Sequence, residues 1–564
     1  MKIIGINCFL HDSSASLVSD GMVIAAAEEE RFNRLKHANG FPVQAIKYCL
    51  KEGGVTIDDI DHVAFFMKPS SKIWHLGIKN YLKHPIKALP SLRGEIYNSA
   101  RMLSLKIYMN DFLNFNVKRK KKFILHIDHH LAHIASAFLT SGYDESAVLS
   151  IDGCGENSTC VMAYATKDNI KVIKRISFPH SLGLVYASLT AFLGFAPLSD
   201  EYKVMGLASY GKPEFYNLIK GMIRSDEKGG FKIDTSYFGY QYEFGGNWVS
   251  KKFHKVFGRP RKDTDAIEDK HKDIAASLQI VVEELGISLA TFLFSKTKSK
   301  NLCIAGGVGL NCVMNGAILR KGLYKNLFVQ PAAHDSGTSL GSALYAHHYL
   351  FRQPADFKMK NSFLGPGYSN EEIKKMLLDN KISYGYHDEI EKITAKYLAD
   401  GKIIGWFQGR MEFGPRALGS RSILADPRNS GMKDIVNERI KHREPFRPFA
   451  PSIMEEYASD YFIGCKKSPF MTFVFPVNKN KIDLIPAVTH IDGTARVQTV
   501  DKENNLKFWK LINEFLGITG VPVLLNTSFN VKGEPIVCSP EDAIRCFYTT
   551  GLDFLVLGNY LISK

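Results

Sequence analysis

The sequence predicts an α/β protein in which a first domain built from a duplicated unit is followed by a smaller second α/β domain. Two observations lead to this fold class. Residues 3–28 and 147–176 each follow the plan strand, turn, strand, turn, strand. The 564 residues, 45% of them hydrophobic, are also enough to bury more than one core. We therefore expect two domains, residues 1–355 and 370–564.

The two copies of the repeated unit correspond strand by strand. The first contains "KIIGIN", "SASLVS" and "MVIAAAE", with an Asp20-Gly21 hairpin turn before its last strand. The second contains "AVLSID", "TCVMAYA" and "IKVIKRI". Each opening strand ends on a polar residue, Asn7 in one and Asp152 in the other. This duplication around a central cleft is typical of the ATPase fold of actin, Hsp70 and sugar kinases, the ASKHA fold.

Two later segments extend this domain toward the cleft. Residues 301–319, "NLCIAGGVGLNCVMNGAIL", predict a buried strand, a glycine-rich bend and a helix. The bend could approach a phosphate or a flat ligand, or could simply be a tight strand-to-helix turn. Residues 328–348 predict another strand, loop and helix, with Asp335 directly before the helix.

Four histidines occur in "HIDHHLAHIASAF", residues 126–138. His126 ends a predicted strand, and Asp128 is a suitable N-cap for the helix that follows. His129 and His133 stand four residues apart on one helical face, so these two can share a ligand. With Asp152 and Asp335 at the same cleft, they would suit iron, manganese or zinc. The alternative is that the histidines only cap or pack the helix.

The positive charge is concentrated in one segment. Residues 68–122 contain 13 Lys or Arg, including "KRKKK" at 118–122, against only Glu95 and Asp111. Apolar residues at helical spacing predict basic amphipathic helices inserted into the first domain. Such a surface is usually a solvated face, and an anionic membrane surface or an acidic partner is the alternative. We expect no nucleic acid, because no known binding motif accompanies the charge.

Cysteine usage and hydropathy bear on the compartment. The nine cysteines are scattered, with no CxxC pair, which suits a reducing environment. The N-terminus does not resemble a signal sequence, and no apolar run of about 18 residues is apparent. These features predict a cytoplasmic protein. They leave the oligomeric state open, a homo-oligomer included.

The second domain is predicted to bind anions. It follows "LGPGYS" at 364–369 and is rich in Arg and Lys set among Gly, Pro and Phe. Such cations are unfavourable to bury unless an anion compensates them, although surface salt bridges are the alternative. The candidate anion-binding residues are Arg410, Arg416, Arg421, Arg428, Lys441, Arg443, Arg447, Arg496, Asn526 and Ser528.

Taken together, several motifs resemble one family. "LHDSSAS", "EERFNRLKH", "HHLAHIASAF", "EYKVMGLASYGKP", "AGGVGLNCVMNG" and "HDSGTSLGSA" are similar to the O-carbamoyltransferases of nodulation-factor and antibiotic biosynthesis, the NodU/CmcH type. The resemblance implies that His129, His133, Asp152 and Asp335 bind a metal, most often iron(II). It also implies that His11 acts on the acceptor hydroxyl, and that the bend carrying Gly306, Gly307 and Asn311 holds the adenosine part of a nucleotide.

For the second domain, the resemblance implies a YrdC-like fold that makes carbamoyl-adenylate from carbamoyl phosphate and ATP, with ATP used as its Mg complex. The carbamoyl group would then pass to a hydroxyl of a small molecule, a sugar or a natural product, in the first domain. Three rivals stay open: a sugar kinase of the same fold, a fused tRNA threonylcarbamoyl enzyme and a non-catalytic binding protein. The residues that the resemblance assigns to the carbamoyl phosphate and ATP pocket are Arg416, Lys441, Arg447, Arg496, Asn526 and Ser528.

Overall fold

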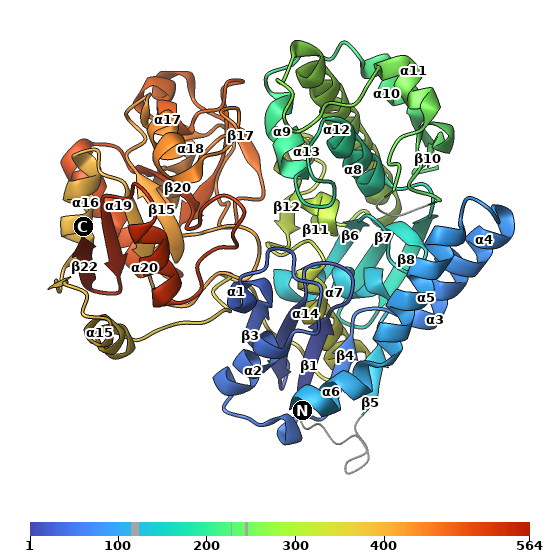
Figure 1. The fold of residues 1–564 in the computed structure, drawn as a ribbon, viewed down its shortest axis with the longest axis horizontal. Coiled ribbons are helices and arrows are strands. Elements are labelled where there is room, and N and C mark those ends of the chain that lie inside the picture. Colours follow the sequence, from blue (N-terminus) through green and yellow to red (C-terminus); the bar gives the residue numbers. More distant parts are fainter. Residues whose placement is uncertain (114–122, 227, 243–245) are drawn as a thin grey trace. The chain divides into compact units, whose positions relative to one another are not determined.

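The structure is a computed structural model that describes residues 1–564 except 114–122, 227 and 243–245 (Figure 1). The chain divides into two compact units. The first contains Met1–Glu29 and His37–Met359. The second contains Glu30–Lys36 and Lys360–Lys564, so a short segment from the N-terminal half belongs to the second unit.

The first unit opens with a five-stranded sheet in the order β3-β2-β1-β4-β5. β1 pairs antiparallel with β2, from Lys2 opposite Ser19 to Asn7 opposite Ser14, and parallel with β4. β4 and β5 are also parallel. The elements are β1 (Lys2–Asn7), β2 (Ser14–Ser19), β3 (Met22–Glu28), α2 (Val43–Glu52), η1 (Ile57–Asp59), β4 (His62–Phe65) and β5 (Phe123–His126).

A second sheet repeats this plan, with the order β8-β7-β6-β11-β12. β6 pairs antiparallel with β7 and parallel with β11, just as β1 pairs with β2 and β4. The predicted duplication is therefore confirmed, and the shared strand order and directions agree with the ASKHA-type fold that the sequence predicts. The strands are β6 (Glu145–Ile151), β7 (Ser158–Thr166), β8 (Ile170–Ser177), β11 (Asn301–Ala305) and β12 (Asn326–Val329).

Two helices, one closing each repeat, pack against each other (Figure 1). α7 (His129–Ser141) contacts β6 and β11 of the second sheet, and α14 (Ser336–Tyr345) contacts β1 and β2 of the first. Gly341 allows the close approach, because a Cβ there would lie 1.8 Å from the carbonyl oxygen of Ala132 in α7. The N-termini of α7 and α14 each carry predicted metal ligands.

Most of the remaining elements of the first unit lie between β8 and β11 in the sequence. α12 is long and apolar enough to cross a membrane by length and composition, which the sequence did not lead us to expect. However, 56% of its most apolar window is buried inside the unit, as in a core helix. The predicted cytoplasmic location stays a prediction. These elements are α8 (Leu182–Phe192), α9 (Glu201–Ala208), α10 (Tyr216–Met222), β9 (Ile223–Asp226), β10 (Gly230–Ile233), η3 (Thr235–Tyr237), α11 (Lys251–Phe257), α12 (Asp269–Thr297), η4 (Gly307–Leu310), α13 (Cys312–Arg320) and η5 (Ala346–Leu350).

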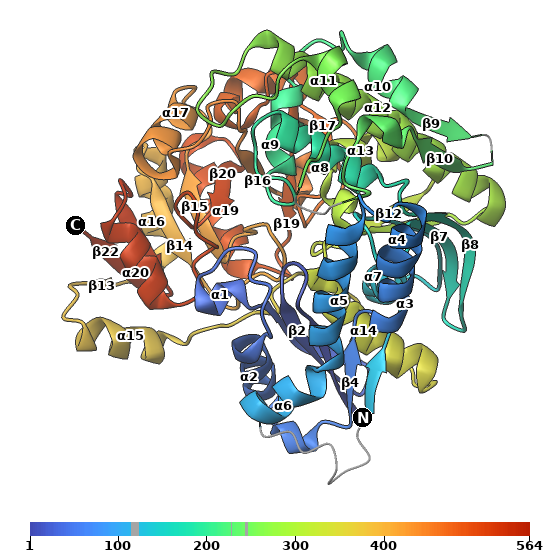
Figure 2. The same ribbon diagram turned by 45° about the vertical axis from the view of Figure 1, so that its right-hand side comes forward.

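The basic segment forms helices between β4 and β5, as predicted, in its described part, residues 68–113. Both views show α3, α4 and α5 side by side at the edge of the first unit (Figures 1 and 2). The run "KRKKK" at 118–122 lies outside the described residues. The helices are α3 (Pro69–Lys72), η2 (Ile73–Ile78), α4 (Lys79–Lys83), α5 (Leu89–Leu103) and α6 (Leu105–Leu113).

The second unit is built on a mixed eight-stranded sheet in the order β13-β22-β21-β14-β15-β20-β16-β19. β17 (Val474–Pro476) and β18 (Thr494–Arg496) form a separate pair. The sheet strands are β13 (Gly385–Tyr386), β14 (Ile404–Phe407), β15 (Arg421–Ala425), β16 (Ala450–Met454), β19 (Gln498–Val500), β20 (Val523–Ser528), β21 (Phe554–Leu557) and β22 (Tyr560–Ser563). The helices are α15 (Asn370–Asp379), α16 (Ile390–Ala399), α17 (Met432–Val436), η6 (Asn437–Lys441), η7 (Glu455–Tyr457), α18 (Ala458–Tyr461), η8 (Lys479–Leu484), η9 (Pro486–Val488), α19 (Leu506–Thr519) and α20 (Pro540–Tyr548).

The segment Glu30–Lys36 completes the second unit from the other half of the sequence. It contains α1 (Glu30–Asn33). Arg34 donates hydrogen bonds to the carbonyl oxygens of Pro535 and Ile536, each at 2.7 Å. Arg31 donates to the carbonyl oxygen of Gly414 at 3.0 Å. Phe32 packs on a buried cluster of Met411, Ile536 and Cys538.

Candidate functional site

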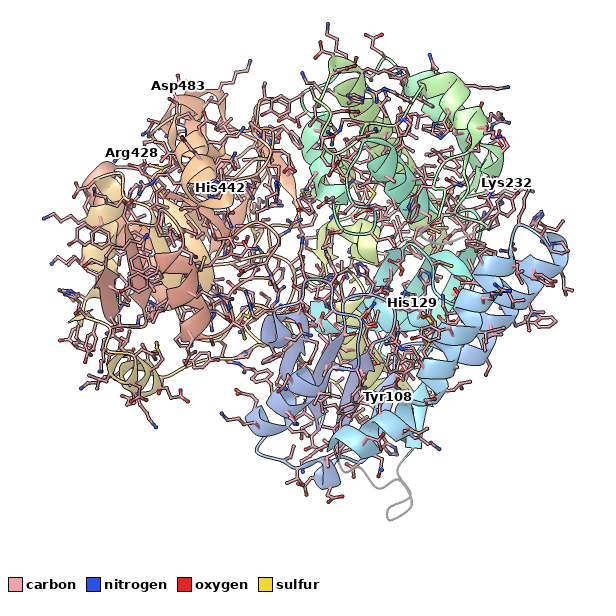
Figure 3. The ribbon with its side chains drawn as sticks, viewed as in Figure 1. Tyr108, His129, Lys232, Arg428, His442 and Asp483 are labelled. Carbon is pink, nitrogen blue, oxygen red and sulfur yellow. The ribbon has the colours of Figure 1, made fainter. Side chains whose placement is uncertain are left out.

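The metal-ligand candidates on α7 are held by the start of that helix. The Asp128 carboxylate accepts a hydrogen bond from the Leu131 backbone N–H at 3.1 Å, as the sequence predicts for an N-cap. His129 and His133 follow one turn apart, and both side chains are completely buried. Their Nε2 atoms lie 3.1 Å apart (Figure 3 labels His129).

Two carboxylates reach the same point from the ends of other elements. Asp152 directly follows β6, and its Oδ2 lies 3.2 Å from Nε2 of His129. Asp335 directly precedes α14, and its Oδ1 lies 3.7 Å from Nε2 of His129 and 3.5 Å from Nε2 of His133. One nitrogen or oxygen atom of each residue lies within 4.8 Å of those of the other three. The structure thus brings together the four residues that the sequence pointed to.

The chemistry of this cluster fits a divalent cation. Ligand atoms about 2.0–2.2 Å from one ion lie about 3–4.4 Å apart, and the distances of 3.1–3.7 Å given above fall in this range. Two imidazole nitrogens 3.1 Å apart repel one another unless a proton or a cation lies between them. Burial lowers the pKa of His129, but its hydrogen bond to Asp152 and the charge of Asp335 outweigh this and raise the pKa to about 9. A bound ion would replace that proton.

The other two histidines of the motif have structural partners. His130 is buried, with Nδ1 at 2.8 Å from Oγ of Ser150 and Nε2 at 2.9 Å from the carbonyl oxygen of Ser158. Burial, and then the charge of His129, lowers the pKa of His130 to about 3. His126 lies at the end of β5, where its Nδ1 is 3.1 Å from the carbonyl oxygen of Met67.

Glu156 supports the cluster and was not found from the sequence. Its carboxylate accepts the backbone N–H groups of His129, at 3.1 Å, and of Lys68, at 2.9 Å. Gly155 leaves room for this arrangement, because a Cβ at that position would lie 2.9 Å from the His129 ring. The sequence signal for Glu156 is its place in the turn "GCGENS" after Asp152. It becomes informative only once Glu156 is known to be buried, because a buried carboxylate needs hydrogen-bond donors.

The glycine-rich bend contacts the metal cluster. Gly307 donates its backbone N–H to Oδ1 of Asp152 at 2.8 Å, so the bend orients one candidate ligand. Gly306 has a φ of 85°, and a Cβ there would lie 2.2 Å from the carbonyl oxygen of Ile151. Asn311 caps α13 and donates to Oε1 of Gln279 at 2.9 Å. The nucleotide-binding role of Gly306, Gly307 and Asn311 stays a prediction.

His11 belongs to a chain of hydrogen bonds in the first unit. Its Nδ1 lies 2.6 Å from Oδ2 of Asp12, whose Oδ1 lies 2.7 Å from Nδ1 of His37. Nε2 of His37 lies 2.8 Å from Oγ of Ser199. Burial lowers the pKa of His11, but the charge and hydrogen bond of Asp12, assisted by Asp335 and Glu201, raise it to about 9. The His11 side chain is about one-third exposed, so its ring is accessible.

Of the predicted anion-binding residues in the second unit, Lys441 and Ser528 are hydrogen-bonded to each other. Nζ of Lys441 donates to the carbonyl oxygen of Ser528. It also donates to two atoms of Asn530, Oδ1 at 2.8 Å and the carbonyl oxygen at 2.9 Å. These three acceptors match its three N–H groups. Burial, then the charges of Arg443 and Arg447, hold the pKa of Lys441 well below its usual range.

Asn526 and Ser528 lie two residues apart on β20. Nδ2 of Asn526 donates to Oγ of Ser452 and Oε1 of Gln498, each at 3.0 Å, and to the carbonyl oxygen of Ala417 at 3.3 Å. Arg416 precedes Ala417, and Arg496 ends β18 two residues before Gln498.

Three of the arginines in this unit have partners within the chain, which corrects the expectation that they bind phosphate. Arg421 is completely buried and donates to the carbonyl oxygens of Gln408 at 2.8 Å and Pro366 at 2.9 Å. Arg410 donates to the carbonyl oxygen of Leu364 at 2.6 Å. The Arg428 guanidinium pairs with the Asp426 carboxylate at 2.6 Å. Backbone oxygens and one carboxylate thus compensate charges that we expected an anion to compensate.

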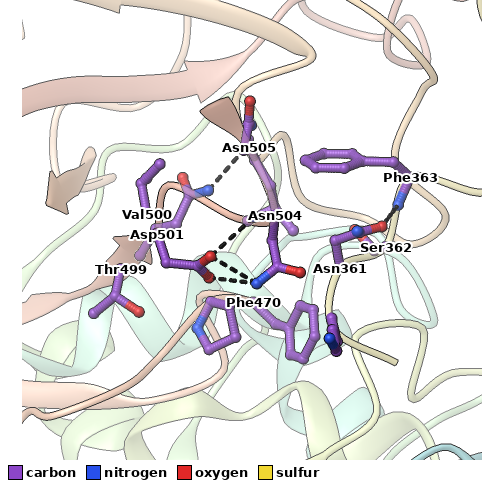
Figure 4. A pocket seen from close by; sticks show the side chains of 13 residues that line it. Asn361, Ser362, Phe363, Phe470, Thr499, Val500, Asp501, Asn504 and Asn505 are labelled. Atoms are coloured by element: carbon purple, nitrogen blue, oxygen red, sulfur yellow. Dashed lines mark hydrogen bonds between the residues drawn. The ribbon is translucent and has the colours of Figure 1, made fainter. Parts of the chain in front are cut away.

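A small pocket of about 20 Å³, partly open to solvent and with room for about one water molecule, lies in the second unit (Figure 4). Phe363, Phe470 and Asn504 border it, and the Asp501 carboxylate accepts the Asn504 backbone N–H at 2.9 Å and Nδ2 of Asn504 at 2.7 Å to each of its two oxygens. Gln498, the partner of Asn526, also lines the pocket. The pocket thus borders the hydrogen bonds that hold Asn526.

Comparisons with known proteins cover both units. Residues 2–344 match the family described as Carbamoyltransferase N-terminus, and residues 395–564 match Carbamoyltransferase C-terminus. The chain is 41% identical to "Uncharacterized protein sll1178" of Synechocystis, over 100% of this chain and 96% of that protein. It is 40% identical to "Nodulation protein NolNO" of Sinorhizobium fredii, over 99% and 80%. Among solved structures, HypF of T. kodakarensis aligns with a TM-score of 0.32 and 14% identity, over 62% of this chain and 48% of that one.

Proposed function

We propose that this chain, which belongs to the carbamoyltransferase family and is therefore a transferase, is an ATP-dependent O-carbamoyltransferase. In the second unit, which we take to be YrdC-like, carbamoyl phosphate would give carbamate and phosphate with water. The carbamate oxygen would then attack the α-phosphorus of ATP, accompanied by Mg, and displace pyrophosphate. The resulting carbamoyl-adenylate would transfer its carbamoyl group to a hydroxyl of a small molecule, with release of AMP.

The observation that carries this proposal is the convergence of His129, His133, Asp152 and Asp335. These four side chains would hold a divalent ion, which we take to be iron(II). Such an ion would supply Lewis-acid polarisation of a carbonyl group. The chain's own contribution is positional: Gly307 holds Asp152, and Glu156 holds the start of α7.

His11 would act on the acceptor hydroxyl. Asp12 occupies its Nδ1, so that Nε2 is the ring nitrogen left to face a substrate. A neutral His11 would take the hydroxyl proton as the oxygen attacks, and Asp12 would stabilise the imidazolium that forms. The raised pKa means that this base form becomes abundant only toward alkaline pH.

In the second unit, Arg416, Arg447 and Arg496 would contact the phosphates, and Asn526 and Ser528 would orient them. Two polyanions brought together repel each other, which gives a physical reason for several cations around one pocket. Lys441 would act differently, because three oxygens of the chain already occupy its N–H groups. We assign it the role of holding the end of β20 and the following loop in place.

The test separates the two half-reactions. Purified protein is incubated with ATP, Mg²⁺ and labelled carbamoyl phosphate, and pyrophosphate release is measured with and without carbamoyl phosphate. The same mixture is screened against sugars, aminoglycosides and macrocyclic alcohols, with mass spectrometry for a gain of one carbamoyl group. Pyrophosphate release that depends on carbamoyl phosphate is expected. Transfer at full rate without ATP would overturn the adenylate step.

A further inference from the structure

The helical insert of the first unit, residues 68–113, exposes an unusual amount of apolar surface. We refer to these residues as the basic insert. Of 23 large hydrophobic side chains exposed in the described part of the chain, eight lie in this stretch. Ile86 is the most exposed of all, at 92%. The eight are Trp74, Leu82, Ile86, Ile96, Tyr97, Leu103, Ile107 and Phe112.

Helix α5 shows that this exposure is built into the fold. Its buried face is mainly polar, with Ser91, Glu95 and Ser99 inside. Nζ of Lys72 lies 3.4 Å from Oε2 of Glu95, and both side chains are less than a tenth exposed. Its outward face carries Ile96, Tyr97 and Leu103 instead. A surface helix of a globular protein normally has the opposite arrangement, with its apolar stripe toward the core.

Positive charge surrounds this apolar surface. Within residues 68–113, all of which are described, Asp111 is the one exposed acidic residue. Residues 82–87, the end of α4 and the turn that follows it, read "LKHPIK" and place Leu82 and Ile86 beside Lys83 and Lys87. The exposed cations of the basic insert are Lys68, Lys79, Lys83, Lys87, Arg93 and Lys106.

We propose that the basic insert docks the protein on an anionic lipid surface, with Leu82 and Ile86 entering the headgroup region. Helices that lie in a membrane interface combine apolar side chains, Trp among them, with Lys and Arg that contact anionic headgroups. A second copy of this chain is the weaker occupant, because it would bring two surfaces of the same charge together. The inference does not depend on the reaction that the protein catalyses.

Docking would bear on the candidate metal site through the base of the insert. The backbone N–H of Lys68, its first residue, donates to the Glu156 carboxylate, which also accepts the backbone N–H of His129. Lys72, one turn later, adds its positive charge near Glu156. The base of the basic insert and the start of α7 therefore share Glu156 as a hydrogen-bond acceptor.

The test is sedimentation of the full chain with vesicles, without substrates. Vesicles of phosphatidylcholine alone are compared with vesicles containing about a third phosphatidylglycerol, at 0.1 and 0.5 M salt. We expect binding to the anionic vesicles only, and at least tenfold weaker binding at the higher salt, because the headgroup attraction is screened.

Two variants of the turn report on its two components. The double variant Lys83→Glu, Lys87→Glu should weaken binding at least tenfold, and Ile86→Asp roughly tenfold, since charge and apolar burial both contribute. Matched controls lie in the second unit: Lys374→Glu with Lys375→Glu, both exposed on α15, and Ile491→Asp, where the isoleucine is 65% exposed. The controls should bind as the unchanged chain does.

Three results would overturn the proposal: no binding to anionic vesicles at 0.1 M salt, equal loss in the control variants, or a solution dimer that Ile86→Asp dissociates. Retention on a polyanionic resin together with no vesicle binding would point to an acidic macromolecule and would overturn it as well. Carbamoyl-phosphate-dependent pyrophosphate release is measured on every variant. Its absence from the unchanged chain would refute the proposed function and leave the docking result intact.

Discussion

Gly341→Ala should destroy the metal cluster from a position that touches none of its ligands. The added Cβ would lie 1.8 Å from the carbonyl oxygen of Ala132, whereas ordinary contact begins at 3.4 Å. A backbone carbonyl inside α7 cannot rotate away, so α7 and α14 must separate by about 1.6 Å. This moves Asp335, at the start of α14, away from the two histidines on α7.

The consequence for an ion follows from the ligand distances. Oδ1 of Asp335 lies 3.5 Å from Nε2 of His133, and the added separation would take this toward 5 Å. Two ligands of one ion at about 2.2 Å each can be at most about 4.4 Å apart. We therefore expect an ion in the variant to have at most three of the four ligands. Its affinity should be at least a hundredfold weaker.

The assay is metal content per chain after loading with Fe²⁺ or Mn²⁺, together with calorimetric titration. Gly221→Ala is the matched control, because a Cβ at this helical position meets nothing within 4 Å, and alanine there should add up to about 1 kcal/mol of stability. Full metal content in Gly341→Ala would refute the reasoning. Should that variant not fold, Asp335→Asn tests the same coordination by removing one charge.

Further predictions concern the histidines. His133→Ala should abolish transfer and leave pyrophosphate release unchanged, whereas equal loss of both would contradict two separate sites. His130→Ala should lower the unfolding free energy by about 1–3 kcal/mol, because it removes the buried hydrogen bonds of His130 to Ser150 and Ser158, yet retain metal. Because the pKa of His129 is raised to about 9, metal affinity should fall about tenfold for each pH unit below 9, as read from Mn²⁺ titrations at pH 6, 7 and 8. Asp12→Asn should lower the pKa of His11, so that diethyl pyrocarbonate, which attacks neutral imidazole, modifies His11 faster at pH 7.

Local patterns in the sequence were sufficient for part of the first unit. The repeated strand plan predicted the three antiparallel strands that open each sheet, because turn chemistry is encoded within about 30 residues, but it did not predict the full five-stranded sheets. The spacing of His129 and His133 separated the converging pair from His126 and His130, since only residues one turn apart share a helical face. The roles of Glu156 and Gly341 depend on contacts between distant segments, which one sequence does not reveal.

The second unit was harder to predict for a physical reason. Arg421 and Lys441 were expected to need an anion, because buried cations require compensation. The chain compensates them itself with carbonyl oxygens from loops far away in sequence, such as those of Pro366 and Asn530. Composition can show that a cation will be buried, but it cannot show which acceptor will reach it.

The placement of Glu30–Lys36 has a practical consequence for anyone who cuts this protein in two. A fragment that starts at Lys360 would lack Phe32, and the buried cluster of Met411, Ile536 and Cys538 would meet water on one side. It would also leave the carbonyl oxygens of Pro535 and Ile536 without the Arg34 guanidinium. Supplying residues 30–36 as a separate peptide should therefore restore the solubility of such a fragment.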